Sequence, residues 1–196
     1  IYSFFVLLIL INNELKADQE TKIFADQIYV NQEENTVKGS GNVLIIGNKI
    51  RSKSNKVIYN ENDGSIEVNG DVIINDIHGN NYFLNQATTN EDFSSLKANS
   101  FKMRLKDNSR LIGTNILKKD DLNVLTNAEY TPCLKENYLI KNCPGWKIKS
   151  NKVYHNLKTK TVHYDHARIH IFNLPIFYLP YFAHPDPSVE KRTGFL

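Results

Sequence analysis

Strict alternation of apolar and polar residues is the feature that most constrains the fold of this chain. In 37–45, and again in 66–74, every second residue is apolar or glycine. A period of two residues is typical of a half-buried β-strand, whereas an amphipathic α-helix places apolar residues three and four positions apart. The alternation therefore predicts β-strands in these segments.

The same signal recurs at a spacing of 29 residues. ADQIYVN at 25–31 aligns with SNKVIYN at 54–60, and GNVLII at 41–46 aligns with GDVIIN at 70–75. Each unit is predicted to contain a strand, a polar turn and a second strand that passes through a glycine. Fainter copies cover 96–105 and the segment from Ile148, where the letters SNKV of 54–57 recur at 150–153. We expect a stack of short strands and no long helix.

The composition is that of a globular chain. Of 196 residues, 41% are hydrophobic and 23% are charged, and the net charge is +3. Lys and Arg are spread along the sequence without a run, which predicts no basic face and argues against a nucleic-acid partner.

The first residues predict export. The apolar run 1–11 is too short to cross a bilayer, which needs roughly 20 residues, and it fits the hydrophobic region of a signal peptide with cleavage after Ala17. A buried core helix is the alternative for this run. Export favours oxidised cysteines, so we expect Cys133 and Cys143 to form disulfides rather than a metal site. The turn residues around them indicate that 107–147 is an excursion between two blocks of strands.

The histidine-rich segment VHYDHARIH at 162–170 is the one candidate for metal or acid–base chemistry. Alternation places His163 and Asp165 on one face of a strand, and Tyr164, His166, Arg168 and His170 on the other. Arg168 between two histidines disfavours a bound cation. The sequence contains no glycine-rich phosphate loop, nucleophile elbow or HExxH motif. We therefore predict no enzyme activity, no cofactor and no metal.

The densest apolar stretch after the first residues is IFNLPIFYLPYF at 171–182. Pro175 and Pro180 exclude a continuous helix and a central strand. Tyr178 and Tyr181 combine an apolar body with a polar tip, as at a membrane interface. An ordinary edge strand and an interfacial strand both remain open.

The stretch IFNLPIFYLPYFAHPDPSVEKRTGFL at 171–196 resembles the junction between the periplasmic domain and the β-barrel in the LptD family of outer-membrane lipopolysaccharide-assembly proteins. YTPC followed by CP-x-W, with Trp146 in place, resembles the Cys/Trp segment of that family, and the glycine-containing repeats resemble the periplasmic fold shared with LptA and LptC. The junction match runs through Pro175, Phe177, Tyr178, Leu179, Pro180, Tyr181, His184, Pro185, Asp186, Pro187, Ser188, Arg192 and 194–196.

The resemblance implies a periplasmic β-jellyroll of two splayed antiparallel sheets, followed by a transmembrane β-barrel that begins within 183–196. It implies the following division: signal peptide 1–17, repeated strands 18–106, the Cys-containing excursion 107–147, and the last strands with the aromatic junction 148–182. Cys133 and Cys143 would pair with each other or with cysteines of the barrel.

The implied function is lipopolysaccharide transport and assembly at the outer membrane. The jellyroll would receive lipid from an LptA-like bridge protein by edge-strand pairing and pass it to a barrel that holds an LptE-like lipoprotein. Seven inward positions are candidates for a lipid lining, although a plain sandwich core explains them equally well. They are Val37, Val43, Ile45, Ile66, Val68, Val72 and Ile74.

Three other functions are also compatible with the sequence. The first is a stand-alone bridge protein of the LptA type. The second is a β-solenoid scaffold, which the 29-residue spacing also suits. The third is a periplasmic hydrolase that uses His163 and Asp165.

Overall fold

The chain folds into β-strands throughout the part that the structure, a computed structural model, describes: residues 21–47, 49–132 and 145–189. No helix among these residues is long and apolar enough to cross a membrane. The strands are β1 Lys22–Phe24, β2 Gln27–Asn31, β3 Thr36–Ile46, β4 Ile50–Asn60, β5 Ser65–Asp76, β6 Asn81–Asn90, β7 Ser95–Arg104, β8 Arg110–Lys119, β9 Leu122–Thr131, β10 Trp146–Asn156, β11 Thr161–Ile171 and β12 Leu174–Pro185.

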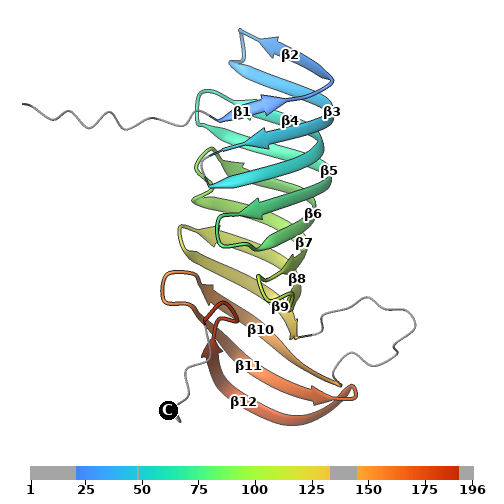
Figure 1. Cartoon of the computed structure of the whole chain (residues 1–196), viewed down its shortest axis with the longest axis vertical. Helices are drawn as coiled ribbons and strands as arrows, with labels where there is room; N and C mark the ends of the chain where they lie inside the picture. The colour runs from blue at the N-terminus through green and yellow to red at the C-terminus, as the bar shows by residue number, and fades with distance from the viewer. Residues whose placement is uncertain (1–20, 48, 133–144, 190–196) are drawn as a thin grey trace, which may run out of the picture.

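All twelve strands belong to one antiparallel sheet, in which consecutive strands from β3 to β12 pair with each other. The order runs from β1 through β3 to β12, and β2 pairs with β3 beside β1. Figure 1 shows the strands stacked along the long axis, with β2 at one end and β12 at the other. Within the described residues β12 pairs only with β11, so the sheet is open, and the prediction of an open all-β jellyroll is confirmed.

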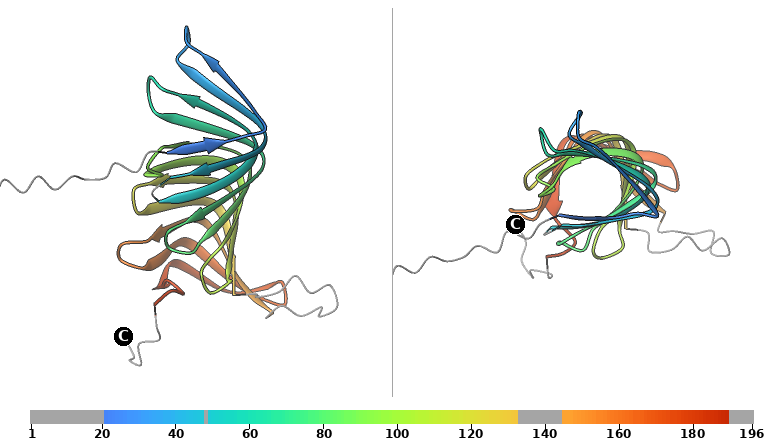
Figure 2. Two further views of the ribbon diagram at one scale, coloured as in Figure 1. Left: turned by 45° about the horizontal axis from the view of Figure 1, so that its top comes forward. Right: turned by 90° about the horizontal axis from the view of Figure 1, so that it is seen from above.

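Each long strand bends near its middle, so that the sheet curves around its long axis (Figure 2). The bends divide the sheet into two walls, which are the two sheets that the sequence predicts, joined into one. Wall A consists of 36–40, 56–60, 65–69, 86–90, 95–99, 115–119, 122–126, 152–156, 161–165 and 181–185. Wall B consists of 43–46, 50–53, 72–76, 81–84, 101–104, 110–112, 128–131, 146–149, 167–171 and 174–179.

The 29-residue repeat reappears as two matching bends. Gly41 and Gly70 have φ of 76° and 77°, and each is followed by a residue with φ of 46°. A Cβ at Gly70 would lie 2.7 Å from Nδ2 of Asn55 on the neighbouring strand. The left-handed backbone and the close approach both require glycine here. Because each of these two bends takes up two residues, the alternation of faces in β3 and β5 continues unbroken from one wall to the other.

The Ser-Asn-Lys sequence, which occurs at 54–56 and again at 150–152, also lies at bends. The Ser54 hydroxyl donates to the carbonyl of Lys56 at 3.1 Å, and the Ser150 hydroxyl donates to the carbonyl of Lys152 at 2.6 Å. In each case a serine side chain bonds to the backbone carbonyl two residues further along the same strand.

Inward side chains from both walls form one hydrophobic core that runs along the sheet. Tyr82, Phe101 and Tyr164 are the largest of its fully buried members. The core continues through β8 and β9, which pair in register with their neighbours. The prediction that 107–147 leaves the repeated strands is therefore wrong for 110–131. It failed because β8 and β9 have a weaker alternation than β3 and β5. Cys133 and Cys143 lie outside the described residues.

Candidate functional site

The seven predicted lining positions lie on the inner face of the sheet. Six of them are 0–1% exposed, and Val37 is half-buried. At this end of the molecule the walls are therefore in contact, and the interior is filled by the protein's own side chains. Lipid contact at these positions would require the walls to separate, so their role as a lining stays a prediction. The six buried positions are Val43, Ile45, Ile66, Val68, Val72 and Ile74.

The interior opens at the opposite end, around β10, β11 and β12. A pocket of about 510 Å³ lies there, lined mainly by apolar side chains. Trp146 is 39% exposed at its rim, and its ring centroid lies 6.1 Å from that of Tyr130. We call this space the mouth. It is lined by Tyr130, Gly145, Trp146, Ile148, Ile169, Ile171, Phe172, Phe182 and His184.

The sequence prediction missed the mouth, although it named Trp146 and His184. The lining residues come from four separate segments, and only the strand register brings them together. A usable signal was present in β11, where Ala167, Ile169 and Ile171 continue the inward face. The prediction placed Arg168 on the same face as Tyr164, and the structure shows this to be wrong. His166 has φ of 54° and forms a bulge, so Tyr164 is buried while Arg168 is exposed.

The strand β12 presents an aromatic surface beside the mouth. Phe177, Tyr178 and Tyr181 are 60%, 52% and 61% exposed. The Tyr178 hydroxyl hydrogen-bonds with Nδ1 of His166, and the Tyr181 hydroxyl hydrogen-bonds with Nδ1 of His163. Two histidines of the VHYDHARIH segment thus position tyrosines on β12. Among the described residues no group of three metal-binding side chains occurs.

Both prolines of the motif are compatible with this strand. Pro175 and Pro180 lie in β12, which is the last strand of the sheet in the described part of the chain. A proline can occupy an edge strand because its missing N–H is not needed on the unpaired side. Opposite Pro175 the pairing with β11 shifts register, between Ile169 and His170.

His184 is the first polar residue after the aromatic surface, and its ring is held between two fixed partners. Its Nδ1–H donates to the carbonyl of Pro185 at 2.6 Å, and its Nε2 accepts from the Tyr164 hydroxyl at 2.8 Å. Burial lowers the pKa of His184, which favours the neutral ring that this arrangement requires.

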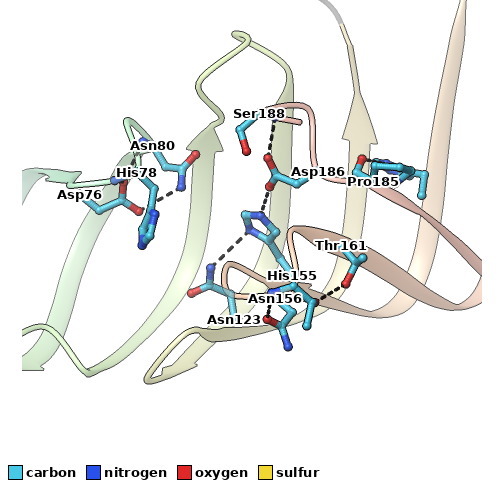
Figure 3. Close-up of polar contacts among 12 residues, drawn as sticks. Asp76, His78, Asn80, Asn123, His155, Asn156, Thr161, Pro185, Asp186 and Ser188 are labelled. Atoms are coloured by element: carbon cyan, nitrogen blue, oxygen red, sulfur yellow. Dashed lines mark hydrogen bonds and ion pairs between the residues drawn. The ribbon is translucent and has the colours of Figure 1, made fainter. Parts of the chain in front are cut away.

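Asp186 fastens the Pro-Asp-Pro turn to the end of the sheet (Figure 3). Its Oδ2 contacts Nε2 of His155, which is completely buried, and its Oδ1 accepts from the backbone N–H of Ser188 at 2.7 Å. Nδ1 of His155 lies 3.4 Å from Nδ2 of Asn123. Because that amide donates, Nε2 is the ring nitrogen that donates to Asp186.

The carboxylate of Asp186 is ionised at this site. Burial opposes its ionisation, but the hydrogen bonds from His155 and Ser188 outweigh burial and hold its pKa well below the ordinary value. The backbone N–H of Asp186 also donates to the carbonyl of Lys160 at 2.8 Å. The turn after β12 is therefore fixed by side chain and backbone together, against β9, β10 and the turn before β11.

Fold and site together define a class: an open, all-β jellyroll with an apolar interior that opens beside an exposed aromatic edge strand. Sequence comparison points to a particular family within that class. The chain is 36% identical over 72 residues to the LPS-assembly protein LptD of Haemophilus ducreyi, which covers 37% of this chain and 8% of that protein. It is 25% identical over 174 residues to the LptD of Photobacterium profundum, which covers 89% of this chain and 18% of that protein. The predicted resemblance to the LptD family is confirmed by these matches.

The other comparisons add less. The LptD of Idiomarina loihiensis is 25% identical over 118 residues, which are 56% of this chain and 16% of that protein. The chain thus spans less than a fifth of the length of these relatives. No protein-family model matches it. Among solved structures, it is similar to LptH, described as the LptA homologous periplasmic component of the lipopolysaccharide transport device from Pseudomonas aeruginosa. That similarity has a TM-score of 0.45 and 11% identity, and it covers 50% of this chain and 75% of LptH.

Proposed function

We propose that this chain takes up the acyl chains of lipopolysaccharide in its apolar interior and delivers them through the mouth toward the outer membrane. The observation that carries the proposal is the mouth itself, an open apolar pocket at one end of a continuous apolar core. The sequence matches to LPS-assembly proteins indicate which amphiphile to expect.

The energetics favour such a route. Each acyl CH₂ group that leaves water gains about 0.8 kcal/mol. The mouth offers Ile148, Ile169 and Phe182 as apolar partners, and its volume is in the range of small-molecule sites. Because the sheet is open, a chain can enter between the walls without breaking a ring of strand pairs.

The aromatic strand β12 would form the contact with the membrane. Its exposed rings, Phe177, Tyr178 and Tyr181, suit the boundary between lipid and water. The turn fixed by Asp186 would then direct the chain into a first barrel strand, and an LptE-like lipoprotein would occupy that barrel. In this proposal the protein acts at the outer membrane as a transporter and catalyses no reaction.

The other end of the sheet would receive the bridge protein. β1 and β2 cover the free edge of β3, β1 on wall B and β2 on wall A. Within the described residues neither pairs on its other side. Ile28, Tyr29 and Val30 of β2 are more than half exposed. An LptA-like partner would add a strand to this edge and extend the interior.

The fluorescence of Trp146 tests the proposal, because it is the only tryptophan and lines the mouth. We expect purified lipopolysaccharide to shift its emission to shorter wavelength in a saturable titration of the full chain. A lipid that carries a spin label on its acyl chain should quench the same emission. Ile169→Asp places a charge in the pocket and should weaken both responses at least about tenfold, since a buried charge is costly.

Leu117→Asp is the matched control, because Leu117 is 55% exposed on the outer face of wall A. This variant should respond as the natural chain does, and circular dichroism should show both variants folded. If lipopolysaccharide left the emission unchanged, or if both variants lost the response equally, the mouth would not be the lipid site. A stand-alone bridge protein of the LptA type would give the same titration, and deletion of 175–182 in the full-length protein separates the two. Deletion should block delivery to the cell surface only if β12 is a junction.

A further inference from the structure

The outer face of wall B is strongly basic, contrary to the expectation that Lys and Arg form no face. The cations lie one or two to a strand and far apart in sequence, and the register aligns them. Lys53 lies opposite Ile73, Phe83 opposite Lys102, and Lys149 opposite Arg168. The basic face consists of Arg51, Lys53, Lys102, Arg104, Arg110, Lys147, Lys149 and Arg168. Glu129 is the one carboxylate among the described residues of these outward rows.

A groove of about 800 Å³ crosses this face beside the bends. Its floor is apolar: Ile73 and Phe83 lie opposite each other on β5 and β6, and Ile112 of β8 is 40% exposed. Lys102, Lys149 and Arg168 line its sides. The guanidinium of Arg104 lies 5.6 Å from the centre of the Phe83 ring. The groove thus combines positive charge with apolar contact area.

Two carboxylates, Asp71 and Glu129, also line the groove and balance its charges only in part within the described residues. The Glu129 carboxylate forms ion pairs with Nζ of Lys147 at 3.3 Å and with Nζ of Lys149 at 3.6 Å. Neither Lys102 nor Arg168 has a carboxylate within ion-pair distance in the parts of the chain that the structure describes, and Arg168 lies directly opposite Lys149. Like charges opposite each other destabilise a sheet. A bound anion would relieve that repulsion.

We propose that this groove binds the phosphate-bearing headgroup of a lipid. Phosphate suits the cations of Lys102 and Arg168. The apolar floor suits the glycerol or acyl carbons that lie next to the phosphate of a lipid headgroup. An acidic protein loop would supply negative charge without these lipid carbons. Tyr178 of β12, which is 52% exposed, continues the face, because it lies opposite Arg168. Basic and aromatic residues together are typical of surfaces that contact anionic membranes. The site lies on the opposite side of the sheet from the interior and does not depend on the proposed function.

Vesicle binding by the full chain tests this proposal. We expect binding to mixed phosphatidylcholine–phosphatidylglycerol vesicles, little binding to pure phosphatidylcholine vesicles, and weaker binding as salt is raised. The double variant Lys102→Glu with Arg168→Glu should reduce binding to the mixed vesicles at least about tenfold, because each cation near an anionic surface contributes about 1 kcal/mol.

The matched control is Lys97→Glu with Lys119→Glu, which makes the same change in net charge on the outer face of wall A. It should bind nearly as the natural chain does. Equal loss in both double variants would overturn the site in favour of diffuse attraction. Displacement of the vesicles by millimolar inorganic phosphate would overturn the lipid assignment in favour of a small-anion site. The response of Trp146 to lipopolysaccharide should be unchanged in the groove variant, which separates this proposal from the proposed function.

Discussion

Single polar residues decide how the last strand ends. Asp63 and Asp186 make the same local contact, because each accepts from the backbone N–H two residues on, at 2.9 Å for Asp63 and 2.7 Å for Asp186. They differ in surroundings. Asp63 lies in an exposed turn, whereas Asp186 is buried against His155. Comparing the two carboxylates isolates the contribution of the buried contact.

Asp186→Asn should therefore destabilise the fold by about 1 to 3 kcal/mol, the usual loss for a buried charged hydrogen bond. Asp63→Asn should have a much smaller effect. The pKa of Asp186 is lowered by folding, so its contribution is fully present above the unfolded carboxyl pKa of about 3.9 and is lost progressively as the pH falls from there toward the lower pKa of the folded state. Urea unfolding between pH 7 and pH 3 measures this. The advantage of the natural chain over Asp186→Asn should be constant near neutral pH and should shrink at pH 3, and a difference unchanged across this range would contradict the assignment.

At the scale of the strand, the bends are the elements that make two walls out of one sheet. The alternation in 37–45 and 66–74 was sufficient to predict the strands and their inward faces. It was not sufficient to predict the bends, because a glycine within a strand is compatible with several local structures. The bulge at His166 shows the consequence, and Ser100 and Asn127 have the same left-handed backbone at the bends of β7 and β9. One residue in the left-handed region reversed the faces of Arg168 and its neighbours, and no alternation rule detects it.

Gly70→Ala tests the bend, with Gly64→Ala as its control. Both glycines have positive φ, at 77° and 65°, so both substitutions carry a backbone cost of about 1 kcal/mol. Only at Gly70 would the new Cβ meet the neighbouring strand, at Asn55, whereas at Gly64 its nearest contact is 3.8 Å away. We expect the Gly70 variant to lose more free energy of unfolding in urea. Equal losses would show that the close approach at the bend is unimportant.

At the scale of the molecule, strand register creates surfaces that no segment contains. The basic face and the mouth each take residues from strands that are distant in sequence. The junction motif and the apolar inner face could both be predicted, because each is written in one continuous segment of the sequence. His155 and Asp186 lie 31 positions apart and meet only because β10 and the turn after β12 reach the same end of the sheet. Contacts of this kind depend on tertiary structure and leave no trace in local periodicity.

We propose that lipid travels on the inner side of the sheet and leaves through the mouth. Photo-crosslinking in cells tests it most directly. A photoreactive residue would replace Ile169 or Phe182 at the mouth, Val43 or Val72 in the core, and Lys38 or Glu67 on the outer face of wall A. We expect lipopolysaccharide adducts at the mouth, adducts in the core where the walls separate during transport, and none at Lys38 or Glu67. Adducts at Lys38 and Glu67 as strong as those at Ile169 and Phe182 would contradict it.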